Sequence, residues 1–291
     1  MYALDAESGD LKWRYETGGD VFSSPAVVDG ALYFGAYDGK VYALKAETGD
    51  LIWSYQTGDG EDEVRSSPAV VDGIVYVGSH DTSLYALETT TVNLVCHFET
   101  RSLVSSSPAI TNGRVYLGSW DSVVYALDAK TGNEIWRYNT DDSVFSSPAV
   151  VKNLVFIGSD DGHVYALDAK NGDLIWRYQT GNHVRCSPAV AAGIVYIGSY
   201  DNKFYALNAE TGEPIWHYET NHWIRSQPAV ANGVVYFGSF DDKFYALDIE
   251  TGELLWNYKA RSAISSGPAV VNGMVYMTSW DGSLYAFGPE N

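Results

Sequence analysis

Short apolar runs alternate with polar turns along the whole chain. Residues 146–180 illustrate the pattern, with apolar segments at 146–151, 154–159, 163–168 and 174–180 separated by stretches rich in Asn, Asp, Gly and Lys. Segments of this length joined by such turns predict a meander of four antiparallel strands. No segment has the apolar spacing of a helix.

The four-strand pattern repeats along the chain. Each repeat opens near a proline, first after 43 residues and then every 40, at Pro25, Pro68, Pro108, Pro148, Pro188, Pro228 and Pro268. A period near 40 with strand patterning is typical of β-propellers. We therefore predict an all-β fold, a seven-bladed β-propeller of four-stranded antiparallel blades, forming one domain over 1–291. Its repeats start near residues 23, 66, 106, 146, 186, 226 and 266.

The two ends of the chain complement each other within this repeat. The last repeat stops after its third strand, near 283–287, whereas residues 11–17 carry a fourth-strand pattern. A closed propeller leaves no blade edge exposed at its ends. We therefore expect residues 1–22 to complete the last blade. Residues 1–5 copy the third strand once more, so they should be displaced or mark a truncated eighth blade.

Several turns have a defined chemistry. Type I′ hairpins need positive φ at both central residues, which favours Asn-Gly and Asp-Gly pairs. The sequence places such pairs after the first strand of five repeats, at Asp29-Gly30, Asp72-Gly73, Asn112-Gly113, Asn232-Gly233 and Asn272-Gly273.

Three positions recur too regularly to carry a unique function. A fourth-strand tryptophan is interpreted as packing between blades rather than as a carbohydrate or electron-transfer site: Trp13, Trp53, Trp136, Trp176, Trp216 and Trp256. The third-strand tyrosines are interpreted in the same way. An aspartate of the second turn recurs as Asp38, Asp81, Asp121, Asp161, Asp201, Asp241 and Asp281. Because further oxygen ligands at calcium spacing are missing, we interpret these aspartates as turn caps.

Composition narrows the possible partners. The chain has 291 residues, of which 46% are hydrophobic and 14% aromatic, and a net charge of −19. It offers no basic patch for nucleic acid and no apolar stretch long enough to insert in a bilayer. The two cysteines, Cys96 and Cys186, fall at different places in the repeat, so we expect them to be unpaired.

The repeats differ most on one face of the predicted propeller, formed by the second turns and the links between blades. Aromatic residues and arginines gather there, and we expect them to surround the mouth of the central channel. The candidate ligand-binding residues are Tyr37, Arg65, His80, Trp120, Phe145, Arg185, Tyr200, Trp223, Arg225, Phe240 and Trp280. Such a set suits a small planar or anionic ligand or a peptide of a partner protein. The alternative is generic aromatic packing, with the arginines paired to nearby acids.

The repeat unit resembles the tryptophan-docking repeat of the pyrroloquinoline-quinone (PQQ) propellers. Residues 124–132, Val-Tyr-Ala-Leu-Asp-Ala-Lys-Thr-Gly, followed by Trp-Arg-Tyr-Asn-Thr at 136–140, carry the resemblance, which extends over nearly the whole chain. The resemblance implies the propeller fold. In the family's dehydrogenases it also implies a vicinal Cys-Cys disulfide, a Ca²⁺ site and a catalytic Asp, and none of these can be placed on this sequence. Many relatives are non-catalytic, and an extracytoplasmic location, periplasmic or at the cell surface, is favoured by the resemblance.

The sequence therefore favours a non-catalytic scaffold that binds a protein or peptide partner, with no cofactor, no catalytic residue and no metal site. Two alternatives stay open. One is a PQQ-dependent oxidoreductase or a remnant that still binds the cofactor. The other is an intracellular scaffold of the WD40 type, although the Trp-Asp pairs at 120–121 and 280–281 stand at the wrong place in the repeat.

Overall fold

The structure, a computed structural model, describes residues 1–60 and 62–288, and over this range it consists of strands, turns and loops. Strands that follow one another in the chain are neighbours in their sheet, and they pair antiparallel. The fold is the all-β, seven-bladed β-propeller that the repeat predicts. The chain divides into two compact units, Met1–Asn139 and Thr140–Asn291. No helix that could span a membrane occurs in the described residues.

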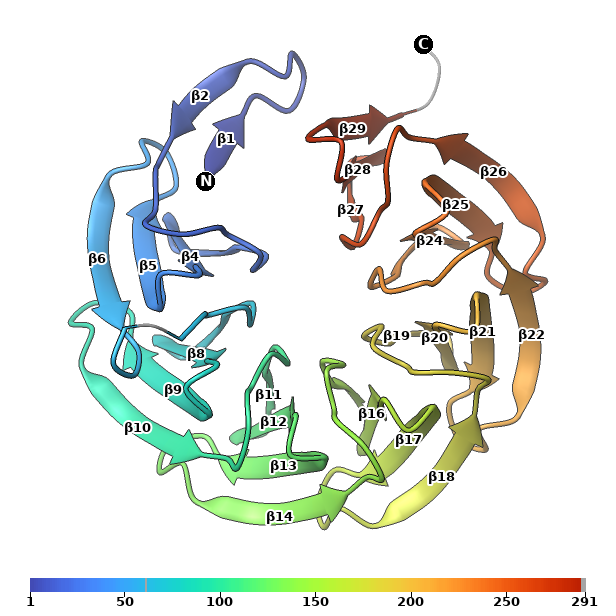
Figure 1. Ribbon diagram of the computed structural model, residues 1–291, viewed down its shortest axis with the longest axis horizontal. Helices are drawn as coiled ribbons and strands as arrows, with labels where there is room; N and C mark the ends of the chain where they lie inside the picture. Colours follow the sequence, from blue (N-terminus) through green and yellow to red (C-terminus); the bar gives the residue numbers. More distant parts are fainter. Residues whose placement is uncertain (61, 289–291) are drawn as a thin grey trace. The chain divides into compact units, whose positions relative to one another are not determined.

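The first unit holds one two-stranded sheet and three four-stranded sheets. The short sheet pairs β1 (Tyr2–Leu4) with β2 (Leu11–Arg14). The strands of the three blades are β3 (Ala26–Val28), β4 (Ala31–Gly35), β5 (Lys40–Lys45), β6 (Leu51–Gln56), β7 (Ala69–Val71), β8 (Ile74–Gly78), β9 (Ser83–Glu88), β10 (Leu94–Glu99), β11 (Ala109–Thr111), β12 (Arg114–Ser119), β13 (Val123–Asp128) and β14 (Glu134–Asn139). In each of these three blades the first and fourth strands form the two edges, as β11 and β14 do (Figure 1).

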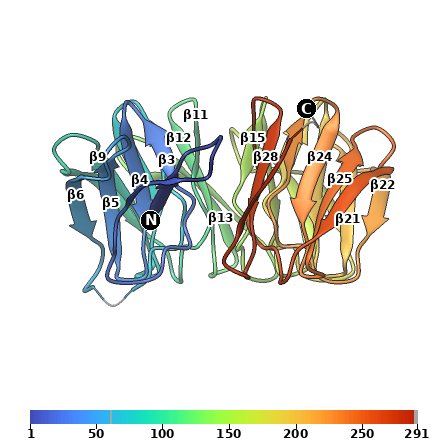
Figure 2. The same cartoon turned by 90° about the horizontal axis from the view of Figure 1, so that it is seen from above.

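The second unit holds three four-stranded sheets and, within the described residues, one three-stranded sheet. Its strands run between two levels of loops (Figure 2). They are β15 (Ala149–Val151), β16 (Leu154–Gly158), β17 (His163–Asp168), β18 (Leu174–Gln179), β19 (Ala189–Ala191), β20 (Ile194–Gly198), β21 (Lys203–Asn208), β22 (Pro214–Glu219), β23 (Ala229–Ala231), β24 (Val234–Gly238), β25 (Lys243–Asp248), β26 (Leu254–Lys259), β27 (Ala269–Val271), β28 (Met274–Thr278) and β29 (Leu284–Phe287).

The first strand of each blade is shorter than the sequence predicts. In the repeat at 146–180, β17 has the predicted bounds, but β15 begins only at Ala149. Pro148 has no N–H to give to a sheet ladder. The Ser146 hydroxyl instead donates to the Cys186 carbonyl of the next blade, at 3.0 Å. The residues before the first strand therefore serve contacts between blades.

The N-terminal strands differ from the sequence-based expectation. We expect residues 11–17 to add a fourth strand to the last blade, but β2 pairs with β1, and the described sheet β27–β28–β29 has three strands. The physical reason is local. Residues 1–5 copy a third strand and residues 11–14 a fourth, and their register shift between Ala3 and Leu4 resembles that of the other third-to-fourth hairpins, such as β17–β18.

The fourth-strand tryptophans join successive blades. Each of four indoles donates its Nε1–H to a carbonyl in the third-to-fourth turn of the following blade, at 2.7–3.1 Å: Trp13 to Ala46, Trp53 to Thr89, Trp176 to Ala209 and Trp216 to Ile249. The ring lies against a turn glycine, and a Cβ on Gly212 would stand 2.6 Å from the Trp176 ring. Only glycine therefore fits that turn without displacing the indole.

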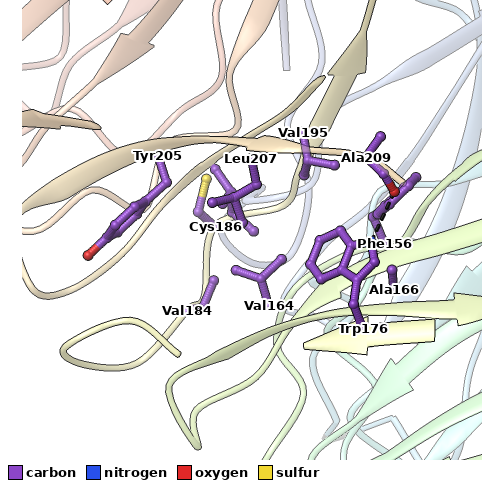
Figure 3. Close-up of a cluster of buried hydrophobic side chains, with 11 residues drawn as sticks. Phe156, Val164, Ala166, Trp176, Val184, Cys186, Val195, Tyr205, Leu207 and Ala209 are labelled. Atoms are coloured by element: carbon purple, nitrogen blue, oxygen red, sulfur yellow. Dashed lines mark hydrogen bonds between the residues drawn. The ribbon is translucent and has the colours of Figure 1, made fainter. Parts of the chain in front are cut away.

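Side chains from two blades make a shared core. Figure 3 shows such a cluster in the second unit, where Phe156 and Trp176 of one blade pack with Val195 and Leu207 of the next. The ring centroids of Phe156 and Trp176 are 5.9 Å apart. Because a single sheet cannot bury both of its faces, this packing buries apolar side chains that one blade alone would expose.

The recurring aspartates cap the second turns. In all seven repeats the third-strand tyrosine donates its hydroxyl to the aspartate four residues earlier, at 2.5–2.8 Å. The second carboxylate oxygen accepts the amide two residues later, as in Asp161 with His163 at 2.9 Å. Most of these aspartates also accept an amide from the link that enters the blade, as Asp161 does from Asp141. The carboxylate thus holds together a turn, a strand and a link.

Candidate functional site

A backbone hydrogen bond fixes the position of the residue that precedes each turn aspartate. Its amide donates to a carbonyl of the link that leads into the same blade, at 2.9–3.0 Å in every repeat: Tyr37 to Asp20, His80 to Glu63, Trp120 to Leu103, Asp160 to Ser143, Tyr200 to His183, Phe240 to Trp223 and Trp280 to Ala263. The side chain takes no part in this bond. Its chemistry can therefore differ from blade to blade while its position stays the same.

Four of the predicted aromatics form a continuous row in the second unit. Trp223 stacks on Tyr200, with ring centroids 4.8 Å apart and planes within 5° of parallel. Phe240 lies between Trp223 and Trp280, with centroid distances of 6.2 Å and 5.3 Å. The Trp280 indole N–H donates to the Ser265 hydroxyl at 2.9 Å. The row is thus ordered by ring contacts and by one hydrogen bond.

The aromatic row lines a groove of about 460 Å³. The groove is bounded by the row itself and by a polar edge, and its lining residues are Asn182, His183, Arg185, Tyr200, Trp223, Arg225, Phe240 and Trp280. Trp223 is 42% exposed and Trp280 is 60% exposed. Indoles usually have most of their surface buried, so two indoles this exposed on one groove are unusual.

Arg185 is held at one end of the groove by a buried acid. Its guanidinium donates to both carboxylate oxygens of Asp160, at 2.7–3.1 Å, and lies 4.1 Å from the centre of the Phe145 ring. These hydrogen bonds to Asp160 raise the pKa of Arg185. His183 Nδ1 also contacts the Asp160 backbone carbonyl. Since Asp160 is buried, the ion pair fixes Arg185 in place.

A second cluster of predicted residues lies in the first unit. The Arg65 guanidinium stands 4.8 Å from the centre of the Tyr37 ring and donates to Glu63 at 2.6 Å. The same carboxylate lies 3.5 Å from His80 Nδ1, and the other ring nitrogen of His80 bonds Ser105 at 2.7 Å. The rings of His80 and Trp120 are 5.7 Å apart. Burial, and then the nearby Arg65, lower the pKa of His80.

The structure thus gathers the eleven predicted residues into two clusters, one in each unit. In the first unit Tyr37, Arg65, His80 and Trp120 lie together, and in the second unit Phe145, Arg185, Tyr200, Trp223, Arg225, Phe240 and Trp280 do. Sequence reasoning missed the two acids that hold the arginines, Asp160 and Glu63. The sequence could have pointed to Asp160 as a partner of an arginine, because it is the one acid among the seven residues that precede a turn aspartate.

Two observations on the described residues concern metal ligands and thiols. No group of three or more His, Cys, Asp or Glu side chains suited to a metal ion occurs among them. Cys96 and Cys186 are both free thiols. Burial raises the pKa of Cys186 to about 12, so this thiol stays protonated at neutral pH. The groove itself presents aromatic faces and guanidinium groups.

Comparison with known proteins agrees with this architecture. Residues 1–96, 60–185, 120–224 and 223–291 match a family model described as outer membrane protein assembly factor BamB, and these ranges together span the chain. No curated protein sequence matches.

Solved structures of three kinds are similar in fold. BamB from Moraxella catarrhalis is 21% identical with a TM-score of 0.82, over 97% of this chain and 87% of that one. The computationally designed Ika8 protein is 21% identical with a TM-score of 0.88, over 98% and 89%. A quinohemoprotein alcohol dehydrogenase from Pseudomonas putida is 18% identical with a TM-score of 0.80, over 96% and 66%. At these identities the similarity concerns the fold alone.

Proposed function

The chain belongs to the propeller family described by outer membrane protein assembly factor BamB, and from this premise we propose that it is a non-catalytic interaction scaffold. Its groove in the second unit, lined by Tyr200, Trp223, Phe240 and Trp280, binds a segment of a partner protein. The observation that carries the proposal is the exposure of two indoles, Trp223 and Trp280, on the same groove. Exposed tryptophans flanked by arginine are the residue types that dominate binding energy in protein interfaces.

The shape of the groove favours a protein segment over a small substrate. Small-molecule sites bury most of their ligand in a concave, largely apolar pocket. Here the aromatic row presents side chains that keep up to 60% of their surface exposed, as Trp280 does. An open groove with exposed rings along it suits an extended chain.

The oxidoreductase alternative needs groups that these residues do not fit. The resemblance to the quinone dehydrogenases implies a vicinal disulfide and a Ca²⁺ site. The two cysteines are free thiols, and no cluster of three His, Cys, Asp or Glu side chains suited to a metal ion occurs in the described part of the chain. Calorimetric titration with PQQ, with and without Ca²⁺, tests this alternative directly, because a quinone enzyme must bind its cofactor.

We also propose an extracytoplasmic location. The family is that of an outer membrane protein assembly factor, and a scaffold for that process would work outside the cytoplasm. Fractionation of cells that produce the protein from its own gene tests this location.

Selection of binding peptides tests the scaffold function. A displayed library of random peptides is selected on the full chain and counter-selected on the double variant Trp223→Ala/Trp280→Ala. We expect the enriched peptides to lose at least about tenfold in affinity on the double variant. The variant Leu255→Ala, at a 52% exposed apolar position of β26, is the matched control and should keep full affinity. Equal binding to all three proteins would place the interaction elsewhere and contradict the proposal.

A further inference from the structure

Three arginines occupy one position of the repeat, but they differ in their partners. Arg65 donates to Glu63, and Arg185 donates to Asp160. Arg225 is exposed, lines the groove, and makes no hydrogen bond or ion pair with any residue that the structure describes. An exposed cation without a partner, beside an aromatic row, leaves its full donor capacity to a ligand.

The reason for this difference lies in the preceding blade. The link arginine of one blade reaches the second-turn residue of the blade before it, as Arg185 reaches Asp160. For Arg225 the corresponding residue is Tyr200, whose ring is already covered by Trp223. No carboxylate therefore stands where Arg225 could reach it in the same way. The sequence thus supplies Asp160 as a counter-ion for Arg185 but places the uncharged Tyr200 at the corresponding position for Arg225.

We propose that the groove binds an acidic peptide segment, with one carboxylate on Arg225 and a neighbouring aromatic or apolar side chain on Trp223 and Trp280. This inference rests on the proposed scaffold function and names the chemistry of its partner. A guanidinium takes a carboxylate through two parallel hydrogen bonds, which fixes the register of the segment along the aromatic row. Arg185 is the weaker competitor for that carboxylate, because Asp160 already neutralises its charge and accepts from its Nε and Nη2.

The charge of the whole protein sets the conditions for such binding. The net charge of −19 repels an acidic partner at long range. At physiological salt this repulsion is screened beyond about 8 Å. The direct contact to Arg225 acts over a single hydrogen-bond length and is screened far less. Binding of an acidic segment should therefore improve as salt rises from very low values toward physiological ionic strength.

A pair of blocked peptides tests the proposal. The probes are the acetylated and amidated heptapeptide Gly-Ser-Phe-Glu-Phe-Ser-Gly and its analogue with Gln in place of Glu, titrated calorimetrically into the full chain at physiological salt. We expect the Glu peptide to bind about tenfold more tightly than the Gln peptide, as a charge-assisted hydrogen bond implies. Arg225→Gln should abolish this difference. Arg177→Gln removes an equal charge from an exposed position on β18 and should keep it.

The outcomes separate this inference from the scaffold function. Equal affinity of the two peptides for the unmodified protein overturns the carboxylate site, and so does an unchanged preference in Arg225→Gln. If in either case Trp223→Ala still weakens binding, the aromatic groove remains the scaffold site.

Absence of binding by both peptides at millimolar concentration overturns the acidic-segment proposal, whereas peptides selected from the random library would still report on the scaffold. If PQQ competes with the peptides, binds more tightly than they do and depends on Arg225, the peptide proposal is overturned and the ligand of the groove is a small planar anion. Circular dichroism and thermal unfolding verify that each variant is folded.

Discussion

Trp223 and Tyr200 form a face-to-face stack across two successive blades, with ring centroids 4.8 Å apart. Trp223 belongs to the link that enters one blade, and Tyr200 to the second turn of the blade before it. Phe240, in the same blade as Trp223, takes the next place in the row. The groove is therefore made by contacts between neighbouring blades, and its shape depends on how those blades dock.

Buried and exposed tryptophans should differ sharply in their effect on stability. Trp176 is buried and donates to Ala209, so Trp176→Ala should lower the free energy of unfolding by about 3–5 kcal/mol. Trp223 is 42% exposed, so Trp223→Ala should cost only about 1 kcal/mol, the worth of an aromatic pair. Urea unfolding followed by circular dichroism measures both. Equal losses would show that the two indoles have the same structural role.

The glycine beneath a docked indole should tolerate no side chain. Gly212 has a φ of +73°, and a Cβ there would meet the Trp176 ring at 2.6 Å. Gly233 has a similar φ of +78° but no atom within 4 Å of its Cβ position. Gly233→Ala should therefore cost about 1–2 kcal/mol for backbone conformation alone. Gly212→Ala should cost about 1–3 kcal/mol more, because the indole must move. Similar unfolding midpoints for the two variants would contradict the docking role of Gly212.

The tyrosine–aspartate bond should matter beyond the packing of the ring. Tyr245→Phe removes a hydroxyl that donates to Asp241 at 2.7 Å, and we expect a loss of about 1–2 kcal/mol in the free energy of unfolding. Tyr236 is the matched control, because its hydroxyl bonds no residue that the structure describes. Tyr236→Phe should be close to neutral. A Tyr245→Phe variant as stable as the parent would show that the hydroxyl contributes nothing.

The turn aspartates should make the protein sensitive to acid. Burial acts to raise the pKa of Asp161, but hydrogen bonds from Tyr165 and the His163 amide outweigh it and lower the pKa below its ordinary 3.8. Hydrogen bonds similarly lower the pKa of Asp281 to about 2 against partial desolvation.

Because the folded state favours the ionised form, these groups contribute their full stabilisation above the ordinary pKa. This contribution is lost as the pH falls from 3.8 toward about 2. Urea unfolding at several pH values should show this loss, and it should be smaller in Asp161→Asn. An identical pH profile for that variant would rule out Asp161 as a source.

The two thiols should differ in reactivity. Cys186 is buried and burial raises its pKa to about 12, so it should resist iodoacetamide at pH 8 until the protein unfolds. Cys96 is half-buried, and burial also raises its pKa, so it should react slowly but before Cys186. Peptide mapping by mass spectrometry after timed labelling measures both rates. Rapid labelling of Cys186 in the folded protein would contradict its burial.

Local rules explain why much of the fold could be predicted from sequence. The type I′ turns are confirmed, because Asp29 and Gly30 have φ values of 50° and 77°, and Asn232 and Gly233 have 51° and 78°. These values follow from the two residues of each turn, so a short window of sequence suffices. The 40-residue period then places each strand, and β17 coincides with the predicted segment.

What could not be predicted depends on choices between partners. The pairing of β2 with β1 competes with pairing to a distant strand, and the repeat pattern fits both. The register shift between Ala166 and Leu167 leaves no signature in the alternation of residues. In the candidate site, the aromatic residues and arginines are visible in the sequence. Whether Arg185 or Arg225 has a counter-ion depends on which neighbouring side chain each reaches, and this is a property of blade packing.

The residue ahead of each turn aspartate is anchored by its amide, as Phe240 is to the Trp223 carbonyl. Recognition and folding are thereby separated at this position, since the backbone specifies where the side chain stands and leaves its identity unconstrained. Under the proposed function, a mutation at Tyr200, Phe240 or Trp280 alters the partner that is bound while the backbone hydrogen bond that anchors the residue remains. A set of such propellers could therefore acquire different partners through single substitutions, each inherited on an unchanged scaffold.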